Sequence, residues 1–332
     1  MAKPWRRGLV IGKFLPPHRG HRFLIDFAAA QAEHLTVLVC TLAEEPIPGP
    51  VRFGWMRESF ERPGVAVLRH DAELPQEPAG ELDHRFWTLW RESIRRLCPA
   101  PDAVFASEAY GARLAMELGA NWVPVDVERT ALPVAARTIR AQPFSHWAEI
   151  LPVARPWFLR RVAIVGPESS GKTCLVRDLA QHFDTGCWVP EYARGYLDAL
   201  GDPGCGDVAH ITAIAHGQAA TEAALTAQAR RLLICDTDLI TTSLWAQVLF
   251  GRCPDGIDQW AQAAHYDLTL VQDVAPWIAD EQRHQPAEAD RTAFRDALIA
   301  RLERAGRRWL LLQGDWRQRR EMAVAALTSL LA

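Results

Sequence analysis

One short segment constrains the fold of this chain more than any other. Residues 166–173 read Gly-Pro-Glu-Ser-Ser-Gly-Lys-Thr, which fits Gly-x-x-x-x-Gly-Lys-Ser/Thr at every fixed position. An apolar run at residues 161–165 precedes the segment, and a helical pattern at residues 174–182 follows it. A loop of this kind, between a strand and a helix, wraps its backbone N–H groups around phosphate oxygens. The segment therefore predicts a P-loop at the carboxyl end of a strand in an α/β fold.

The side chains of this loop and of a later strand predict a site for ATP and Mg²⁺. Lys172 is placed to reach the β- and γ-phosphate oxygens, and Thr173 to bind the metal. Asp236 follows the apolar run 232–235, where a carboxylate holds Mg²⁺ directly or through water, and Asp238 is the second choice. Either aspartate could instead only cap the helix that follows. The predicted ATP-binding residues of this half are Gly166, Ser169, Ser170, Gly171, Lys172 and Thr173.

Two further segments of this half carry charges suited to phosphoryl transfer. Glu191 and Arg194 follow the first helix after the loop, where a carboxylate could orient or deprotonate a hydroxyl and Arg194 could contact phosphate or substrate. Residues 280–284 could close over ATP as a lid, with Arg283 on the transferring phosphoryl group. The alternatives are a surface ion pair and a solvated charged loop, respectively.

The N-terminal half also alternates strands with helices. Its apolar runs are typical of strands in a parallel sheet covered on both faces and lie at residues 9–11, 35–42, 65–68, 103–105 and 122–125. Two prolines break the rhythm between residues 151 and 157, after which the alternation restarts. We therefore predict an α/β fold with two parallel-sheet domains, residues 1–152 and 161–332, joined by a linker at residues 153–160.

A second motif lies between the first predicted strand and its helix, at residues 12–21. His18 and His21 stand three apart at the helix start, near the positive end of its dipole, and Lys13 precedes them. Such a constellation can hold a triphosphate and stabilise charge on a departing pyrophosphate, although one histidine could be purely structural. The residues assigned to this phosphate site are Gly12, Lys13, Phe14, His18, Gly20 and His21.

Composition and charge exclude several classes of protein. The formal net charge is −3, so no global basic field favours nucleic acid or an anionic membrane surface. The seven cysteines form no Cys-x-x-Cys pair and no Cys/His cluster, which gives no support to a disulfide framework or a zinc site. No apolar run is long enough to span a bilayer. We therefore expect a cytoplasmic protein without a membrane partner, and a homo-oligomer is compatible with the sequence.

Residues 12–21 resemble the Gly-x-Phe-x-Pro-x-His-x-Gly-His signature of the HxGH nucleotidyltransferases at every fixed position. The resemblance implies a Rossmann-like domain that joins a nucleoside triphosphate to a phosphate acceptor and releases pyrophosphate. The second motif of that family, a Ser/Thr-rich turn ending in Ile-Arg, corresponds to residues 133–140. Arg140 matches and is assigned a catalytic role. Ala135 replaces the usual serine and Arg137 a small hydroxyl residue, so one or two phosphate donors are missing.

The order of both motifs and of their flanking strings resembles the bifunctional nicotinamide-nucleotide adenylyltransferase/ribosylnicotinamide kinase family of the NadR type. The matching strings lie at residues 104–108, 125–126, 143–147, 166–173, 188–194 and 236–242. The resemblance implies that a C-terminal P-loop kinase domain phosphorylates nicotinamide riboside with ATP, giving nicotinamide mononucleotide (NMN). The N-terminal domain then adenylylates NMN with ATP, giving NAD and pyrophosphate. Some members carry an N-terminal helix-turn-helix. Because the first strand here begins near residue 9, we expect no DNA binding.

A substrate with a pyridinium ring favours aromatic faces. Trp87 and Trp90 are candidates in the first domain, although both also fit the apolar stripe of their helix and core packing is the more frequent role. The predicted substrate-binding residues are Trp87, Trp90, Glu191, Tyr192, Arg194 and Asp238.

Two alternative functions stay open at this point. The first domain could be a degenerate nucleotide sensor beside an active kinase, which the departures at Ala135 and Arg137 favour. The chain could also be a P-loop regulatory NTPase that signals to a partner and has no small-molecule acceptor.

Overall fold

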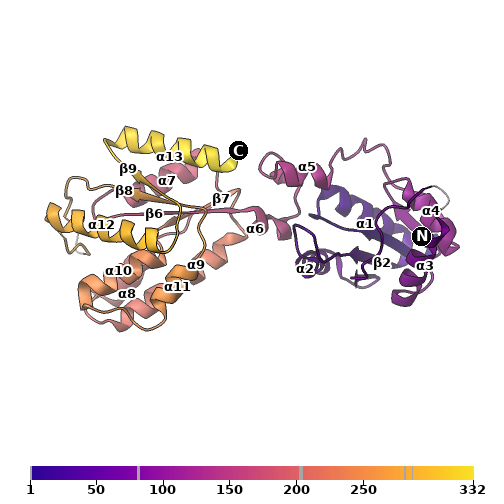
Figure 1. Ribbon diagram of the computed structural model, residues 1–332, viewed down its shortest axis with the longest axis horizontal. Coiled ribbons are helices and arrows are strands. Elements are labelled where there is room, and N and C mark those ends of the chain that lie inside the picture. The colour runs from indigo at the N-terminus through magenta and orange to yellow at the C-terminus, as the bar shows by residue number, and fades with distance from the viewer. Residues whose placement is uncertain (1, 81–82, 202–204, 280–281, 286) are drawn as a thin grey trace. The chain divides into compact units, whose positions relative to one another are not determined.

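The computed structural model of the chain describes residues 2–80, 83–201, 205–279, 282–285 and 287–332. The chain divides into two compact units, Met1–Arg155 and Pro156–Ala332 (Figure 1). The boundary falls within the predicted linker of residues 153–160, most of which is helical rather than extended. A 3-10 helix (Pro152–Ala154) leads directly into α6 (Arg155–Phe158). The proline at the first position of the 3-10 helix has a backbone already set for a helical turn.

The first unit contains a parallel sheet of five strands in the order β3-β2-β1-β4-β5. The direction of the winding reverses at β1, so a crevice opens beyond the carboxyl ends of β1 and β4. The N-terminal motif follows β1 and therefore lies at this crevice. The strands are β1 (Trp5–Gly12), β2 (Ala32–Cys40), β3 (Val65–His70), β4 (Ala103–Ala106) and β5 (Asn121–Pro124).

Helices cover both faces of this sheet. Leu24, Ile25 and Ala28 form an apolar stripe on α1 that packs into one core with Met56 and Phe60 of α2. Residues of α3 and α4 pack into a second core against the opposite face. The helices are α1 (Arg19–Gln31), α2 (Gly49–Phe60), α3 (His84–Leu97), α4 (Tyr110–Leu118), α5 (Ala136–Ala141) and the 3-10 helix Trp147–Glu149.

The second unit contains a parallel sheet of four strands in the order β7-β6-β8-β9. Val189 forms one parallel bridge with Cys235, so the segment that ends at Glu191 runs beside β7. This places Glu191 and the carboxyl end of β7 at the same edge of the sheet. The strands are β6 (Arg160–Val165), β7 (Leu232–Asp236), β8 (Leu268–Gln272) and β9 (Trp309–Leu312).

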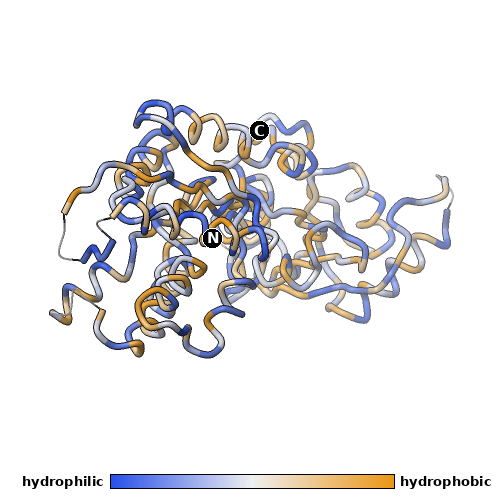
Figure 2. The backbone as a smooth tube through the Cα atoms, turned by 60° about the vertical axis from the view of Figure 1, so that its left-hand side comes forward, coloured by the Kyte–Doolittle hydropathy of each residue, from blue (hydrophilic) through white to orange (hydrophobic). Residues whose placement is uncertain are grey.

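The helices of the second unit also form two layers (Figure 1). Leu175 and Leu179 of α7 pack with Ala323 and Leu327 of α13 against one face of the sheet. Figure 2 shows how apolar stretches (orange) alternate with hydrophilic ones (blue) along the backbone. The helices are α7 (Lys172–His182), α8 (Tyr192–Leu200), α9 (Ala209–Thr226), α10 (Leu239–Phe250), α11 (Ile257–Ala263), α12 (Glu288–Arg304) and α13 (Trp316–Leu331). No helix among the described residues is long and apolar enough to cross a membrane.

Candidate active sites

His18 and His21 together cap the start of α1. The backbone N–H of Gly20 donates to His18 Nδ1 at 3.2 Å, and the backbone N–H of His18 donates to His21 Nδ1, also at 3.2 Å. The two imidazoles stack with their centroids 3.7 Å apart, and the edge of Phe14 packs against His21. Because each Nδ1 accepts a backbone proton, the neutral tautomer of each ring carries its hydrogen on Nε2.

Both histidines are neutral in this environment. Burial, with the charge of Arg129 as the second cause, lowers the pKa of His18 from 6.5 to about 4. Burial lowers the pKa of His21 well below its ordinary value, and the charges of His18 and Arg129 act in the same direction. At neutral pH the pair therefore presents two neutral N–H donors that suit phosphate oxygens.

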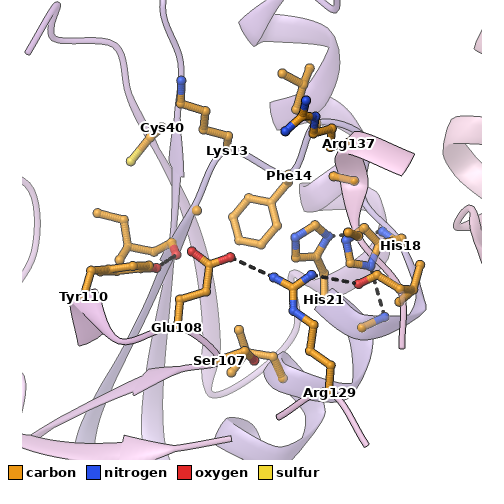
Figure 3. Close-up of a pocket in the computed structure, with 18 of the residues that line it drawn as sticks. Lys13, Phe14, His18, His21, Cys40, Ser107, Glu108, Tyr110, Arg129 and Arg137 are labelled. Carbon is orange, nitrogen blue, oxygen red and sulfur yellow. Dashed lines mark hydrogen bonds and ion pairs between the residues drawn. The ribbon is translucent and has the colours of Figure 1, made fainter. Parts of the chain in front are cut away.

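A cavity of about 700 Å³ lies beyond β1 and β4, with both histidines in its wall. Arg129 reaches into it between the histidines and Glu108 (Figure 3). Its guanidinium donates to Glu108 Oε1 at 2.9 Å and to the carbonyl of Val134 at 3.4 Å. The Arg129 backbone has φ +52°, a left-handed conformation that costs about 1–3 kcal/mol in a non-glycine residue and concentrates at functional sites. Arg129 is thus a cavity cation that the sequence motifs do not reveal.

Lys13 lines the same cavity but is tied to a buried carboxylate. Its Nζ lies 3.1 Å from Glu45 Oε1. Glu45 also pairs with Arg52, whose fully buried guanidinium donates to the carbonyls of Lys13, Cys40 and Ile47. Arg52 therefore holds both the backbone of Lys13 and the carboxylate that contacts the Lys13 ammonium.

The second family motif also reaches the cavity. Ala135 precedes α5 and makes no side-chain capping bond, so it contributes backbone alone. Arg137 and Arg140 line the cavity, and Arg140 donates to the carbonyl of Leu15. Gly12, Phe14 and Gly20 line it as well. The cavity therefore lacks the hydroxyl donors of the family motif, but Arg129 and Arg137 supply cationic donors in its wall.

Trp87 and Trp90 form an aromatic wall of the cavity and also belong to the core packing of α3. Trp90 stacks on His70 at 5.1 Å with an angle of 11° between the rings, and its indole N–H donates to the Pro75 carbonyl. Trp87 is partly buried, with the guanidinium of Arg113 5.8 Å from its ring centroid. The packing and the cavity-lining roles therefore coincide in these two residues.

The P-loop of the second unit has the backbone that its sequence requires. Gly166 has φ +143°, and a Cβ there would lie 2.7 Å from the carbonyl oxygen of Gln272. Gly171 has φ +86° and precedes the first turn of α7. Lys172 Nζ donates to the carbonyls of Gly166 and Pro167 at 3.2 and 3.0 Å, so the ammonium lies over the loop that would wrap the phosphates.

Thr173 and Asp236 lie together although they are far apart in the sequence. Thr173 Oγ1 donates to Asp236 Oδ2 at 2.5 Å. Among the described residues, the other carboxylate oxygen of Asp236 has no hydrogen-bond partner and is buried. Burial and the nearby charge of Glu191 raise the pKa of Asp236 to about 6, against the opposing charge of Lys172. A hydroxyl beside an unpartnered carboxylate oxygen fits the hard oxygen ligands of Mg²⁺, which takes few protein ligands and completes its shell with phosphates and water.

A cavity of about 140 Å³ continues from the P-loop toward α8, α9 and α10. Glu191 and Arg194 both line it. Glu191 stands at the start of α8 without a side-chain capping bond, so its carboxylate is not used by the helix. The apolar side of the cavity includes Leu197, Ile214 and Trp245. The arrangement resembles the acceptor end of a phosphoryl-transfer site, with a carboxylate and a cation beside the phosphate loop.

Two of the residues predicted to contact substrate, Asp238 and Tyr192, make other contacts in this structure. Asp238 Oδ1 accepts from the backbone N–H and the hydroxyl of Thr241 at 2.8 and 2.7 Å, so the carboxylate caps α10. Tyr192 packs its ring against Gly217 of α9 and stacks with Tyr196. Neither residue lines the described cavity. In both cases helix capping and helix packing satisfy the side chain away from the site.

The P-loop also holds the segment in which a lid is predicted. Glu168 Oε2 accepts from the backbone N–H groups of His284 and Gln285 at 2.8 and 2.9 Å. Ser169 Oγ donates to the Pro276 carbonyl, and Ser170 Oγ bonds within the loop. In this structure both serine hydroxyls are therefore engaged with backbone carbonyls. Arg283 lines the cavity and donates to the carbonyl of Ile278, whereas residues 280 and 281 of the predicted lid lie outside the described residues.

Comparison with known proteins connects both sites to one family. The chain is 30% identical over 318 residues to the trifunctional NAD biosynthesis/regulator protein NadR of Escherichia coli (strain K12), matching 89% of this chain and 76% of that protein. The chain belongs to the NadR family of NAD biosynthesis proteins. The NadR protein of Salmonella typhimurium matches with the same identity and coverage.

The fold comparison agrees with this membership. A crystal structure of NadR protein in complex with NAD and AMP-PNP covers 98% of this chain, with a TM-score of 0.78 and 22% sequence identity. A family profile described as an AAA domain matches residues 161–319, which contain the P-loop. The predicted NadR-type resemblance and the predicted α/β fold with two parallel sheets are therefore confirmed.

Sequence reasoning missed two functional candidates. Arg129 follows β5 by five residues in a loop without a motif pattern, so only the structure shows that it lines the cavity with the histidines. The string 125–126 just before it is a weak signal that could have found it. Glu168 occupies a variable position of the P-loop pattern, so its hydrogen bonds with the backbone of residues 284 and 285 are visible only in the structure.

Proposed function

We propose that this protein makes NAD from nicotinamide riboside in two ATP-dependent steps, one in each unit. The second unit transfers the γ-phosphoryl group of ATP to nicotinamide riboside and produces NMN and ADP. The first unit transfers the adenylyl group of another ATP to NMN and produces NAD and pyrophosphate. One observation carries the proposal: a single chain of the NadR family holds both a complete P-loop with a facing carboxylate and a neutral histidine pair in a large cavity.

In the proposed kinase step, the P-loop backbone and Lys172 bind the β- and γ-phosphates. Thr173 and Asp236 would hold Mg²⁺, which when bound neutralises phosphate charge. Glu191 accepts the proton of the sugar hydroxyl as its oxygen attacks the γ-phosphorus in line, and the bond to the β–γ bridging oxygen breaks. Arg194 stabilises charge on the transferring group or orients the acceptor. The leaving group is ADP.

In the proposed adenylyl step, a phosphate oxygen of NMN attacks the α-phosphorus of ATP and the bond to the α–β bridging oxygen breaks. His18 and His21 donate their Nε2 hydrogens to phosphate oxygens, and Arg129 adds a full charge beside them. Lys13, Arg137 and Arg140 add further cationic donors along the wall. The aromatic wall of Trp87 and Trp90 faces the pyridinium ring. Catalysis rests on positioning and charge stabilisation, without a covalent intermediate.

Product analysis tests both steps in one experiment. The protein is incubated with nicotinamide riboside, ATP and Mg²⁺, and NMN, NAD, ADP and pyrophosphate are quantified. We expect ADP to appear with the phosphorylated riboside and pyrophosphate to equal NAD. If NMN is not converted at high enzyme concentration while the kinase step is intact, the first unit is a nucleotide sensor. ATP hydrolysis that does not respond to the riboside would instead favour a regulatory NTPase.

A further inference from the structure

The order of the strands sets the direction in which a nucleotide lies on the P-loop. The loop follows β6, and Glu191 and Asp236 both lie on the β7 side of that strand. The γ-phosphate must point toward them, because the acceptor and the metal-binding groups lie there. The nucleoside end of the same molecule must then extend to the opposite side, toward the carboxyl ends of β8 and β9.

An exposed indole stands at that side. Trp316 is the first residue of α13, which follows β9 after a short turn. The side chain is 44% exposed. Its Cζ3 lies 3.3 Å from the position that a Cβ on Gly171 would occupy, so the ring borders the residue before Lys172. Across the described ranges, no other aromatic ring and no guanidinium stacks on this indole.

Hydrogen bonds fix the first turn of α13, which carries the indole of Trp316. Asp315 and Gln318 form a capping box, in which the backbone N–H of each residue donates to the side chain of the other at 2.9 Å. Arg319 donates to the carbonyls of Gly314 and Asp273 at 2.8 and 2.9 Å, which ties the turn to the end of β8. A platform fixed in this way loses little conformational entropy when a ring stacks on it.

A second tryptophan on this side, Trp277, already has guanidinium groups beside its ring. Trp277 follows β8, but the guanidinium groups of Arg283 and Arg291 lie 5.9 and 5.2 Å from its ring centroid. Trp316 is therefore the better platform, since its ring makes no such contacts.

We propose that Trp316 is the stacking platform for the purine base of the nucleotide bound at the P-loop. The proposal rests on the proposed kinase site. Stacking uses the π-face that every base presents, so Trp316 contributes to nucleotide affinity and not to the chemical step. The proposed contact is with the base alone, and the phosphate groups are assigned to the P-loop.

Two ligands that share a diphosphate and differ in the nucleoside isolate this contact. Binding of Mg²⁺–ADP and Mg²⁺–pyrophosphate is measured by calorimetry in a His21→Ala background, which weakens the phosphate site of the first unit. The Lys172→Ala variant is measured in the same background, and the part of the ADP and pyrophosphate binding that this change removes is assigned to the P-loop site. We expect Trp316→Ala to weaken ADP binding about tenfold and to leave pyrophosphate binding unchanged, and Trp316→Phe to retain most of the affinity.

Trp157→Ala is the matched control, because that tryptophan of the second unit is 46% exposed and lines neither cavity. It should change the binding of neither ligand. Equal loss of ADP and pyrophosphate binding in Trp316→Ala would show a merely structural role and overturn the proposal, as would unchanged ADP binding. If Lys172→Ala does not weaken ADP binding, the P-loop site itself fails, and the proposed kinase function and the platform fail with it.

Discussion

His18 caps helix α1 and lines the cavity of the first unit, so one imidazole contributes both to the fold and to the proposed adenylyl-transfer site. Both tasks need the neutral ring, since a protonated Nδ1 could not accept the Gly20 N–H. Burial among apolar groups and the charge of Arg129 supply the neutrality. The protonation state of the proposed phosphate donors therefore depends on buried surroundings that the motif does not encode.

The low pKa of His18 predicts a loss of stability in acid. Its pKa is 6.5 ordinarily and about 4 in the folded protein, so the unfolded chain binds more protons between these values. Stability therefore falls as the pH drops below 6.5. We expect His18→Asn, which keeps a capping side chain, to lose less free energy of unfolding than the wild type between pH 7 and pH 5, by up to about 2 kcal/mol. Urea unfolding at both pH values measures the difference.

The His18→Asn variant keeps His21 and Arg129, so the comparison with the wild type isolates the titration of His18. Equal pH dependence in the two proteins would contradict a neutral His18.

Arg129→Gln should slow NAD formation from NMN about a hundredfold, since the change removes the full charge beside the histidine pair. Riboside phosphorylation should be unchanged. The pKa of His18, followed by NMR titration, should rise, because the Arg129 charge lowers it in the wild type. Arg57→Gln is the control: it removes an exposed arginine that pairs with Glu61 and lies over the Phe53 ring on the surface of α2. A histidine pKa that does not move would contradict the placement of Arg129.

At the scale of elements, the close approach of α8 and α9 positions Glu191, the proposed base for the acceptor hydroxyl. Tyr192 follows Glu191 directly, and its ring carbons would lie 2.1–2.4 Å from a Cβ on Gly217. Its backbone N–H donates to Gln218 of α9 at 3.0 Å. The start of α8, and Glu191 with it, therefore depends on a glycine in the neighbouring helix.

Gly217→Ala should lower the free energy of unfolding by about 1–3 kcal/mol, because the methyl group forces Tyr192 away. The kinase rate should fall more than the adenylyl rate, since Glu191 moves with Tyr192. Gly195→Ala is the matched control: Gly195 lies inside α8 and a Cβ there meets nothing within 4 Å, so that change should stabilise by about 0.5–1 kcal/mol. Thermal unfolding and the two product assays check both variants. Similar behaviour of the two variants would contradict the packing argument.

The strands were predictable from sequence, while most helices of the second unit were not. The inner strands β7 and β8 are continuous apolar runs that are buried throughout, as expected for a covered parallel sheet, whereas β5 at the edge of its sheet is mostly exposed. Helix α10 shows why the helices are harder. Polar residues such as Thr241 and Ser243 are buried on it beside Leu239 and Leu244. No apolar face stands out against a polar one, so the periodic signal of a surface helix is lost.

At the scale of the whole molecule, each unit carries its own sheet and its own cavity. Lys172→Ala should abolish riboside phosphorylation and leave adenylylation of NMN nearly intact, and His21→Ala should do the reverse. Each lost contact costs about 10²–10³ in rate. If either change silenced both reactions in a folded protein, the assignment of one reaction to each unit would be wrong.

A mixture of the Lys172→Ala and His21→Ala variants tests whether NMN is released into solution between the two reactions. Neither variant alone should convert nicotinamide riboside to NAD, and the mixture should restore conversion because NMN made by one protein can enter the other. NAD measured after mixing, against each variant alone, decides the point. No NAD from the mixture, with each single reaction still active, would show that NMN does not pass through solution.

Sequence alone determined the fold class and the core of each site. Both motifs need a strand, a tight turn and a helix in succession, so local chemistry specifies a parallel α/β fold and places Lys172, Thr173 and the histidine pair. Tertiary structure alone decided which distant residues join them. It brought Arg129 to His18, and it used the Asp238 carboxylate as the cap of α10. Such choices depend on burial and on pairs formed across the chain, whose energies no local pattern contains.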